Sequence, residues 1–544
     1  MQKLIFSIFI FTCLINIHAQ ITFDLQDTLR GSITPERSWW DLTYYHLDIE
    51  VDPEKRFISG TNTIQYKVVG EQNLFQVDLQ PPMVADRFVQ NGKELEYQQI
   101  GNVYYVSTLR SSRDELKELI VHYHGHPTVS TNPPWTGGFT WKKDSNDNHF
   151  AATSCQGDGA SMWWPCKDHM YDEPDSMLIS VTVPEKLMDV SNGKLRSIEA
   201  RKKGTRTFHW FVDNPINNYG VNVNIGDYAH FAEVYHGEGG ALDCDYYVLH
   251  ENLKKAKNQF KQVPMMLEAF EYWFGPYPFY EDGFKLVEVP YLGMEHQSSV
   301  TYGNHYQNGY LGQDRSDSGW GLKFDFIIIH EAGHEWFANN ITNKDIADMW
   351  IHEGFTAYSE ALYLEHHYGK EAGDAYNIGK RFRIRNDRPI IGTYNVNRSG
   401  SGDMYVKGAN MLHTLRHWAN DDVAWRNMLR GLNKDFYHQT VTTQEVEDYI
   451  SKSLNLDLSS FFDQYLRDTR IPILQYRLIE NTLWYRWSNC NKAFDMSIKV
   501  QIDGDEQWLN PKFGWSKMEF DNPIKTLQPD HNFYVASMEH RMYD

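Results

Sequence analysis

The hydrophobic pattern of this chain changes period twice, and this change constrains its fold more than any other feature. From about residue 21 to residue 232, apolar and polar residues alternate in short runs between turn residues, as in half-buried β-strands. From about residue 233 to residue 470, apolar residues recur every three or four positions, as in amphipathic helices. After Ile471-Pro472 the alternation returns. The clearest strand-like runs are 44–51, 60–68, 178–183, 476–479 and 496–502, and the clearest helical runs are 252–274, 322–339, 354–367 and 406–415.

These patterns predict a multi-domain α+β protein. A chain of 544 residues is too long for one hydrophobic core. Its 41% hydrophobic and 15% aromatic content is ample for packed domains. We expect an N-terminal β-sandwich-like domain at 20–232, a mainly helical domain at 233–470 and a small C-terminal β domain at 471–544.

The charge of the chain excludes two classes of function. The formal net charge is −20, and no dense run of Lys or Arg interrupts the acidic background. Proteins that bind nucleic acid or anionic membranes need a basic face, so we expect neither partner. An acidic surface instead attracts cationic ligands, such as the α-ammonium group of a peptide. We expect no membrane span in the mature chain, because no later segment has enough consecutive apolar residues.

The first residues have the pattern of a signal peptide. Met1-Gln2-Lys3 is a short basic start, residues 4–15 are apolar or small, and Ala19 offers a cleavage point. A membrane anchor is the alternative, although the stretch is shorter than the ~20 residues that span a bilayer. Lipidation at Cys13 is a second alternative, which Phe11-Thr12 disfavours. We predict a signal peptide at 1–19 and export to the periplasm or the medium.

Four cysteines remain after this segment, and their spacing matches no zinc ribbon: Cys155, Cys166, Cys244 and Cys490. The sequence leaves open whether Cys155 and Cys166 form a disulfide.

The most informative motif lies in the helical region. The apolar run 326–329 leads into His330-Glu331-Ala332-Gly333-His334. Residues i and i+4 lie one turn apart on one helix face, so His330 and His334 can bind a single metal ion. Glu331 is placed to reach a water molecule on that metal rather than the metal itself. An H-E-x-x-H pattern by itself also arises by chance, so a third ligand is the test.

Glu353 meets that test. It follows His334 after 18 residues, a gap that accommodates a helix end, a loop and a returning helix. Catalytic zinc typically takes three protein ligands and leaves a fourth position for water. Glu360 lies two turns further along the same face and can hydrogen-bond a ligand histidine. The alternative, that both are ordinary solvent-facing acids, is disfavoured by their apolar neighbours.

This arrangement resembles the gluzincin metallopeptidases, in particular the M1 family of zinc aminopeptidases. The resemblance implies a thermolysin-like catalytic domain, one Zn²⁺ per chain and peptides with a free N-terminus as substrates. It also suggests a three-domain form without the family's C-terminal helical domain.

Residues 290–296 resemble the family's G-x-M-E-N motif, with Leu292 and His296 as departures from it. This implies substrate binding by Gly293 and Met294, with Glu295 anchoring the α-amine.

Three further matches extend the resemblance. Tyr405-Val406-Lys407-Gly408 is similar to Y-x-K-G, whose tyrosine stabilises the tetrahedral intermediate. Residues 164–168 are similar to F/W-P-C-x-D, and Gln156 lies near the position that helps to bind the α-amine. Tyr291 is a candidate wall of the first specificity pocket, with plain core packing as its alternative.

Together these residues predict a zinc-dependent aminopeptidase. Glu331 acts as general base on a zinc-bound water, and Tyr405 stabilises the intermediate. Two alternatives remain: a zinc endopeptidase, which shares the metal site but needs no α-amine anchor, and a non-catalytic peptide-binding relative with a degenerate site. The sequence does not indicate an oligomeric state.

Overall fold

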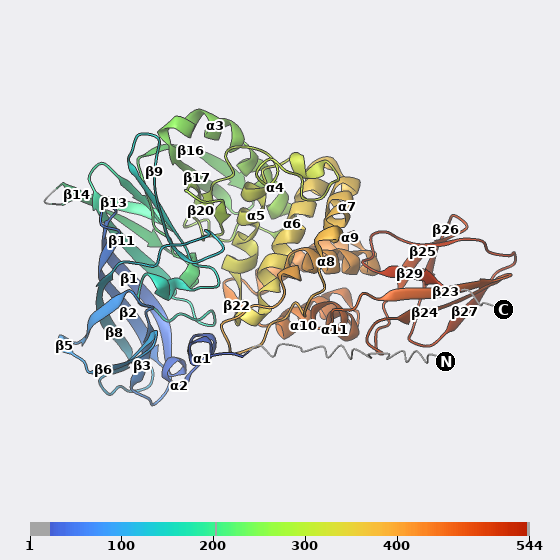
Figure 1. The fold of residues 1–544 in the computed structure, drawn as a ribbon, viewed down its shortest axis with the longest axis horizontal. Coiled ribbons are helices and arrows are strands. Elements are labelled where there is room, and N and C mark those ends of the chain that lie inside the picture. Colours follow the sequence, from blue (N-terminus) through green and yellow to red (C-terminus); the bar gives the residue numbers. More distant parts are fainter. Residues whose placement is uncertain (1–21, 202–203, 541–544) are drawn as a thin grey trace, which may run out of the picture.

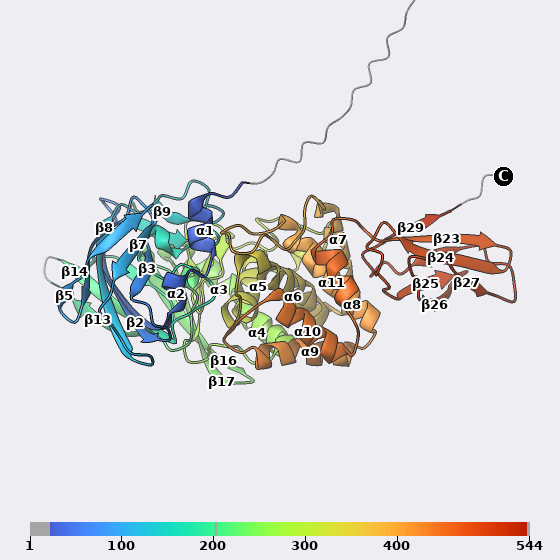
Figure 2. The same ribbon diagram turned by 90° about the horizontal axis from the view of Figure 1, so that it is seen from below.

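The computed structural model describes residues 22–201 and 204–540. It has three regions in chain order along its longest axis: a β-rich region, a helical region and a small β region (Figures 1 and 2). This confirms the predicted multi-domain α+β class. The predicted signal peptide at 1–19 lies outside the described residues. No helix within the described ranges is long and apolar enough to cross a membrane.

The N-terminal region is built on a mixed eight-stranded sheet. Its strand β1 alternates as predicted, with Leu47, Ile49 and Val51 buried and the residues between them more exposed. A bulge between Leu42 and Tyr44 shifts the register against β2, which allows both Leu42 and Tyr45 to face the core. The strands in sheet order are β13 (Lys194–Ala200), β14 (Thr205–Val212), β11 (Ser176–Pro184), β1 (Trp40–Asp52), β2 (Phe57–Val68), β8 (Leu116–Gly125), β4 (Val84–Gln90) and β5 (Lys93–Glu94).

Smaller sheets complete this region. One has four strands and one has three: β12 (Met188–Val190), β15 (Asn224–Gly226), β10 (His149–Ser154) and β9 (Gly138–Lys143), then β3 (Leu74–Asp78), β7 (Val103–Ser107) and β6 (Tyr97–Ile100). Two short helices, α1 (Leu25–Gly31) and α2 (Pro35–Ser38), precede them. The thiols of Cys155 and Cys166 are buried and do not form a disulfide.

A five-stranded sheet leads into the helical region. Its strands in sheet order are β16 (Tyr228–Gly237), β17 (Gly240–Leu249), β18 (Phe284–Glu288), β20 (Val300–Tyr302) and β19 (Gly293–Met294). The predicted boundary at 232/233 falls inside β16. Apolar side chains of this sheet, such as Tyr246, Leu286 and Val300, share one core cluster with the helices. Others, such as Tyr247, Leu249 and Val287, belong to the core cluster of the N-terminal region.

Nine α-helices follow in the described part of this region. They are α3 (Leu253–Gln259), α4 (Gln262–Phe274), α5 (Phe326–Gly333), α6 (Trp350–Tyr368), α7 (Lys370–Gly379), α8 (Val406–Ala419), α9 (Asp422–Asp435), α10 (Thr443–Leu454) and α11 (Ser459–Leu466). A short parallel pair, β21 (Ile341–Asn343) and β22 (Gln439–Val441), lies among them.

Two predicted helices are shorter than expected. The run 252–274 is divided into α3 and α4 at Phe260 and Lys261. The run 322–339 is α-helical only over α5. Asp325 caps its start by accepting a hydrogen bond from the Ile327 amide, and a short distorted π-helix, Glu335–Asn340, follows its end. After His334 the chain leaves the helix, with non-helical torsions at Phe337 and Ala338. Hydrophobic periodicity continues through both breaks, which is why it does not reveal them.

The C-terminal region consists of two small sheets. In sheet order they contain β27 (Ser516–Glu519), β24 (Thr482–Ser488), β23 (Ile473–Ile479) and β29 (Ala536–Glu539), then β26 (Asp505–Leu509), β25 (Ile498–Ile502) and β28 (Leu527–Pro529). The loop before β29 contacts the helices: Arg381 donates hydrogen bonds to the carbonyls of residues 531–533. The Tyr465 hydroxyl likewise donates to the Tyr534 carbonyl.

Candidate metal centre and active site

The two histidines of the central motif converge on one point with Glu353. His330 lies on α5, His334 follows at its C-terminal end, and Glu353 lies on the first turn of α6. Glu353 Oε2 is 3.3 Å from His334 Nε2 and 3.7 Å from His330 Nε2. All three residues are buried, and their ligand atoms lie within 4.8 Å of one another. The structure thus brings together the three predicted ligands.

The side-chain atoms that face one another in this group have the chemistry of zinc ligands. Glu353 Oε2 is buried and makes no hydrogen bond within the described residues, although an unsatisfied buried carboxylate oxygen is costly. Two imidazole nitrogens and one carboxylate oxygen are a typical catalytic zinc donor set. Burial by itself would raise the pKa of Glu353, but the adjacent His334 and His330 lower it overall, which keeps the carboxylate charged.

Each histidine is oriented through its other ring nitrogen. His330 Nδ1 lies 2.8 Å from Glu360 Oε1, as predicted. Glu360 Oε2 in turn accepts hydrogen bonds from Lys380 Nζ at 2.8 Å and from the Tyr376 hydroxyl at 2.6 Å. This set of buried partners holds the imidazole so that Nε2 faces Glu353.

The break after α5 orients the second histidine. His334 Nδ1 lies 3.0 Å from the carbonyl oxygen of Phe337, which the non-helical torsions turn toward it. The Thr356 hydroxyl, on α6, is also 3.0 Å from this nitrogen. The end of the helix at this point therefore serves the geometry of the site.

Glu331 lies beside the three candidate metal ligands, in a second group of possible ligands with Glu295 and His334. Carboxylate oxygens of Glu331 and Glu295 lie within 4.8 Å of a ring nitrogen of His334 and of each other. Burial raises the pKa of Glu331 to about 7. A carboxyl group with a pKa near neutrality can both accept and return a proton.

The carboxylate of Glu295 is held by hydrogen bonds from side chains of the N-terminal region. Its Oε1 accepts hydrogen bonds from Gln156 Nε2 at 2.6 Å and from the Tyr219 hydroxyl at 3.1 Å. Gln156 Nε2 also donates to Glu353 Oε1 at 2.9 Å. Glu295 is 2% exposed, and no lysine or arginine in the described ranges forms an ion pair with it. The structure therefore brings Gln156 to Glu295 and Glu353, while its role in binding the α-amine stays a prediction.

Tyr405 contacts two of the candidate metal ligands, Glu353 and His330. Its hydroxyl donates a hydrogen bond to Glu353 Oε1 at 2.9 Å, and its ring lies parallel to that of His330, with ring centroids 6.1 Å apart. The phenol is thus at the edge of the metal site, on the residue just before α8.

These residues line one cleft of about 380 Å³. Gly293 and Met294, on β19, form part of its wall. A side chain at Gly293 would bring a Cβ atom within 2.6 Å of Ile327 Cγ2, so glycine is needed where β19 approaches α5. Leu292 also lines the cleft, while His296 is buried outside it.

Tyr291 does not line this cleft. Its hydroxyl donates to the Thr153 carbonyl at 2.6 Å, and the side chain is buried. A role for Tyr291 in substrate binding stays a prediction.

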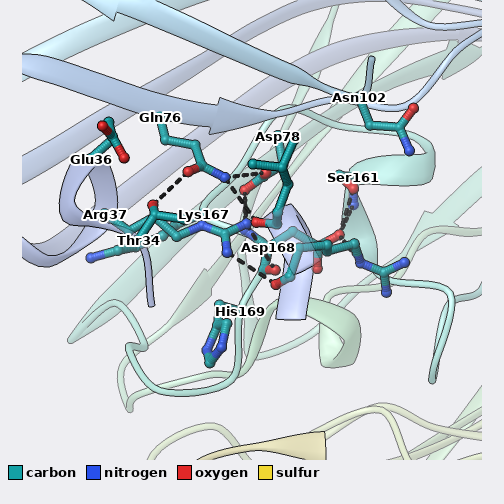
Figure 3. Close-up of polar contacts among 12 residues, drawn as sticks. Thr34, Glu36, Arg37, Gln76, Asp78, Asn102, Ser161, Lys167, Asp168 and His169 are labelled. Carbon is teal, nitrogen blue, oxygen red and sulfur yellow. Dashed lines mark hydrogen bonds and ion pairs between the residues drawn. The ribbon is translucent and has the colours of Figure 1, made fainter. Parts of the chain in front are cut away.

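The stretch 164–168 is fixed by buried charges of the N-terminal region (Figure 3). Arg37 Nη2 lies 2.6 Å from Asp78 Oδ2, and the Asp168 amide donates to the same oxygen at 3.0 Å. Lys167 Nζ donates to the Trp40 carbonyl at 2.8 Å and pairs with Asp172. This network fixes the segment beside the Gln156 end of the cleft.

Sequence reasoning missed four side chains that support the site: Tyr219, Thr356, Tyr376 and Lys380. Thr356 lies three residues after Glu353 on the same helix face, so its position could have been inferred from helical spacing. The other three come from separate elements, and no local pattern marks them.

Comparisons with known proteins agree with this geometry. Residues 258–465 match the family model of the peptidase family M1 domain. A probable aminopeptidase 1 of Sulfurisphaera tokodaii is 19% identical over 412 residues, covering 71% of this chain and 50% of that protein. Aminopeptidase N of Lactococcus lactis is 24% identical over 204 residues, covering 35% of this chain and 23% of that protein. The chain thus spans half or less of the length of these curated relatives.

A solved structure shows the same fold. An M1 zinc metallopeptidase variant from Deinococcus radiodurans, bound to a Tyr-Ser-Ala substrate, superimposes with a TM-score of 0.66. The two sequences are 21% identical, and the match covers 79% of this chain and 95% of that one.

Proposed function

Because residues 258–465 match the family model of the peptidase family M1 domain, we propose that this chain is a zinc-dependent aminopeptidase that removes the N-terminal residue of peptides. The proposal rests on one observation above the others. The carboxylate of Glu295, hydrogen-bonded to Gln156, is buried in the same cleft as the three candidate metal ligands, and no lysine or arginine of the described residues pairs with it.

We assign the zinc to His330, His334 and Glu353. When bound there, the ion supplies a Lewis acid that polarises the scissile carbonyl and lowers the pKa of water to about 7. Residues of the chain orient the ligands and transfer the protons. Glu360 and the Phe337 carbonyl hold the two imidazoles, which leaves both Nε2 atoms directed at Glu353.

Glu331 is the proposed general base. It removes a proton from the attacking water and later delivers that proton to the leaving amine. Its burial suits both steps, because a pKa of about 7 makes the carboxylate a useful base and the carboxyl a useful acid near neutral pH.

Tyr405 is the proposed stabiliser of the oxyanion that forms on the substrate carbonyl. Its hydroxyl is already at the edge of the metal site, where it donates to Glu353. A donor at such a position typically contributes a factor of about 10² to 10³ to kcat.

Glu295, Gln156 and Tyr219 select for a free N-terminus. A carboxylate buried with neutral partners gains a counter-ion when a peptide α-ammonium enters, whereas a blocked N-terminus leaves the acid unpaired. The distance between the Glu295 carboxylate and the metal site then limits cleavage to the first peptide bond. Gly293 and Met294 line the same cleft, where they can contact the bound peptide.

A panel of fluorogenic aminoacyl substrates, assayed with and without a chelator, tests this proposal. We expect hydrolysis of the free-amine substrates, loss of activity with the chelator and recovery on addition of Zn²⁺. An endopeptidase would instead cleave N-acetylated peptides internally. A non-catalytic peptide-binding relative would hydrolyse neither kind of substrate in the presence of zinc.

A further inference from the structure

A second group of metal-ligating side chains lies away from the cleft, on helices α7 and α8 where they meet the C-terminal β region (Figure 1). His413 and His417 are one turn apart on α8, and Asp374 is on α7. Their ligand atoms lie within 4.8 Å of one another. We propose that Asp374, His413 and His417 bind a second divalent transition-metal ion of the zinc class.

The distances within this group suit a shared ion better than direct contacts. Asp374 Oδ1 is 3.7 Å from His417 Nε2 and 3.9 Å from His413 Nε2. These separations are too long for hydrogen bonds. Ligand atoms bound to one tetrahedral zinc at its usual bond lengths are about 3.4 Å apart. Only small side-chain movements are needed to reach that geometry.

An unsatisfied nitrogen supports the same site. His417 Nε2 is buried and makes no hydrogen bond within the part of the chain that the structure describes. Buried polar atoms normally have a hydrogen-bond partner or a bound ion, so the lack of one at this nitrogen needs an explanation. A cation placed between it and Asp374 Oδ1 would supply that partner. The His413 side chain is 2% exposed, so the site is shielded from bulk water on that side.

Asn532, from the loop before β29, provides a candidate fourth ligand. Its Oδ1 is 2.9 Å from His413 Nε2, while its Nδ2 donates to Asp530 Oδ1 at 3.0 Å, which fixes the orientation of the amide. One nitrogen cannot both donate a proton and bind a cation. Metal binding therefore replaces the His413–Asn532 hydrogen bond and leaves Oδ1 facing the ion. The bound metal would then connect the C-terminal β region to α7 and α8.

The surrounding charges favour a metal that binds imidazole strongly. Arg416 is close by, but its guanidinium pairs with Glu365 at 2.6 and 2.8 Å and with Asp422 at 2.7 Å. Arg381 donates to backbone carbonyls of the Asn532 loop and has no carboxylate partner among the described residues. One carboxylate beside a positive residue is a poor site for Ca²⁺ or Mg²⁺, whereas two imidazoles suit zinc, copper or nickel.

Metal content tests this proposal directly. The full chain without an affinity tag is loaded with Zn²⁺, freed of unbound metal and analysed by mass spectrometry for zinc per chain. We expect two zinc ions per chain in the wild-type protein and one in His417→Ala, with peptidase activity retained. His366→Ala is the matched control, because His366 is a similarly half-buried histidine near a single carboxylate, and we expect it to keep two.

Two further variants separate this site from the catalytic one. Glu353→Gln disables the catalytic ligand set and should retain the one zinc held by Asp374, His413 and His417. Combined with Asp374→Asn, it should hold almost none. If His417→Ala fails to fold, Asp374→Asn alone reports the same loss from two to one. A wild-type protein with one zinc, or a Glu353→Gln protein with none, would overturn the proposal.

Discussion

Glu295 offers the sharpest test of how the cleft selects its substrate. We predict that Glu295→Gln lowers kcat/KM for free-amine substrates while its zinc content stays that of the wild type. In the structure, Oε1 accepts from Gln156 and Tyr219, and an amide oxygen can keep both hydrogen bonds. The new NH₂ group then occupies the position of Oε2 and faces the substrate's α-ammonium group. The substitution therefore removes an attraction and adds a repulsion without disturbing the neighbours.

The expected loss follows from the burial of this carboxylate. Removing one partner of a buried, hydrogen-bonded charge pair costs about 2 to 5 kcal/mol. At 1.36 kcal/mol per factor of ten, kcat/KM falls by about 30- to 5,000-fold. The assay compares kcat/KM for an aminoacyl fluorogenic substrate between the wild type and Glu295→Gln at equal zinc content, with Glu281→Gln as the control at an exposed glutamate. A kcat/KM for Glu295→Gln within threefold of the wild type would refute the assignment of Glu295.

Three further predictions concern the metal site and the N-terminal core. Tyr405→Phe should lower kcat about 10²- to 10³-fold with little change in KM, because it removes a transition-state donor; steady-state kinetics measures this. Glu360→Gln should weaken zinc binding about 10- to 100-fold, because it weakens the hydrogen bond that orients His330; competition with a zinc indicator measures the affinity. Arg37→Met should cost about 3 to 5 kcal/mol of unfolding free energy, because it leaves Asp78 charged and buried; denaturant unfolding measures the loss.

Each of these has a clear contrary result. A Tyr405→Phe enzyme within threefold of the wild-type kcat would exclude the phenol from transition-state stabilisation. Equal zinc affinities in wild type and Glu360→Gln would show that the carboxylate does not position its histidine. For the core, Arg196→Met removes an exposed ion pair with Asp213 and should cost less than about 1 kcal/mol. A loss no larger for Arg37→Met would contradict the argument.

Local spacing was enough to select the three residues that the structure brings together as candidate metal ligands. The i, i+4 pair His330 and His334 depends only on helix geometry, and Glu353 and Glu360 share one face of α6 for the same reason. The alternation of β1 also follows from the sequence alone, because one face of the strand is buried. Features that depend on a single helix or strand could therefore be predicted from the sequence.

Features that depend on contacts between distant elements could not be predicted from the sequence. Tyr219 meets Glu295 across 76 residues, and this contact depends on how the N-terminal sheets pack against the helical region. Lys380 reaches Glu360 from beyond the end of α7, for which periodicity gives no signal. The helix end after His334 was missed because the apolar pattern continues through Phe337. The resemblance suggested Gln156, but only the three-dimensional packing brings it to Glu295.

The most direct measurement of the central proposal is the turnover of Glu331→Gln at full zinc occupancy. Glu331 is not one of the proposed ligands, so the variant should bind as much zinc as the wild type. With the base removed, we predict that kcat for a free-amine peptide falls about 10²- to 10⁴-fold. Unchanged hydrolysis by a zinc-loaded Glu331→Gln protein would contradict the mechanism.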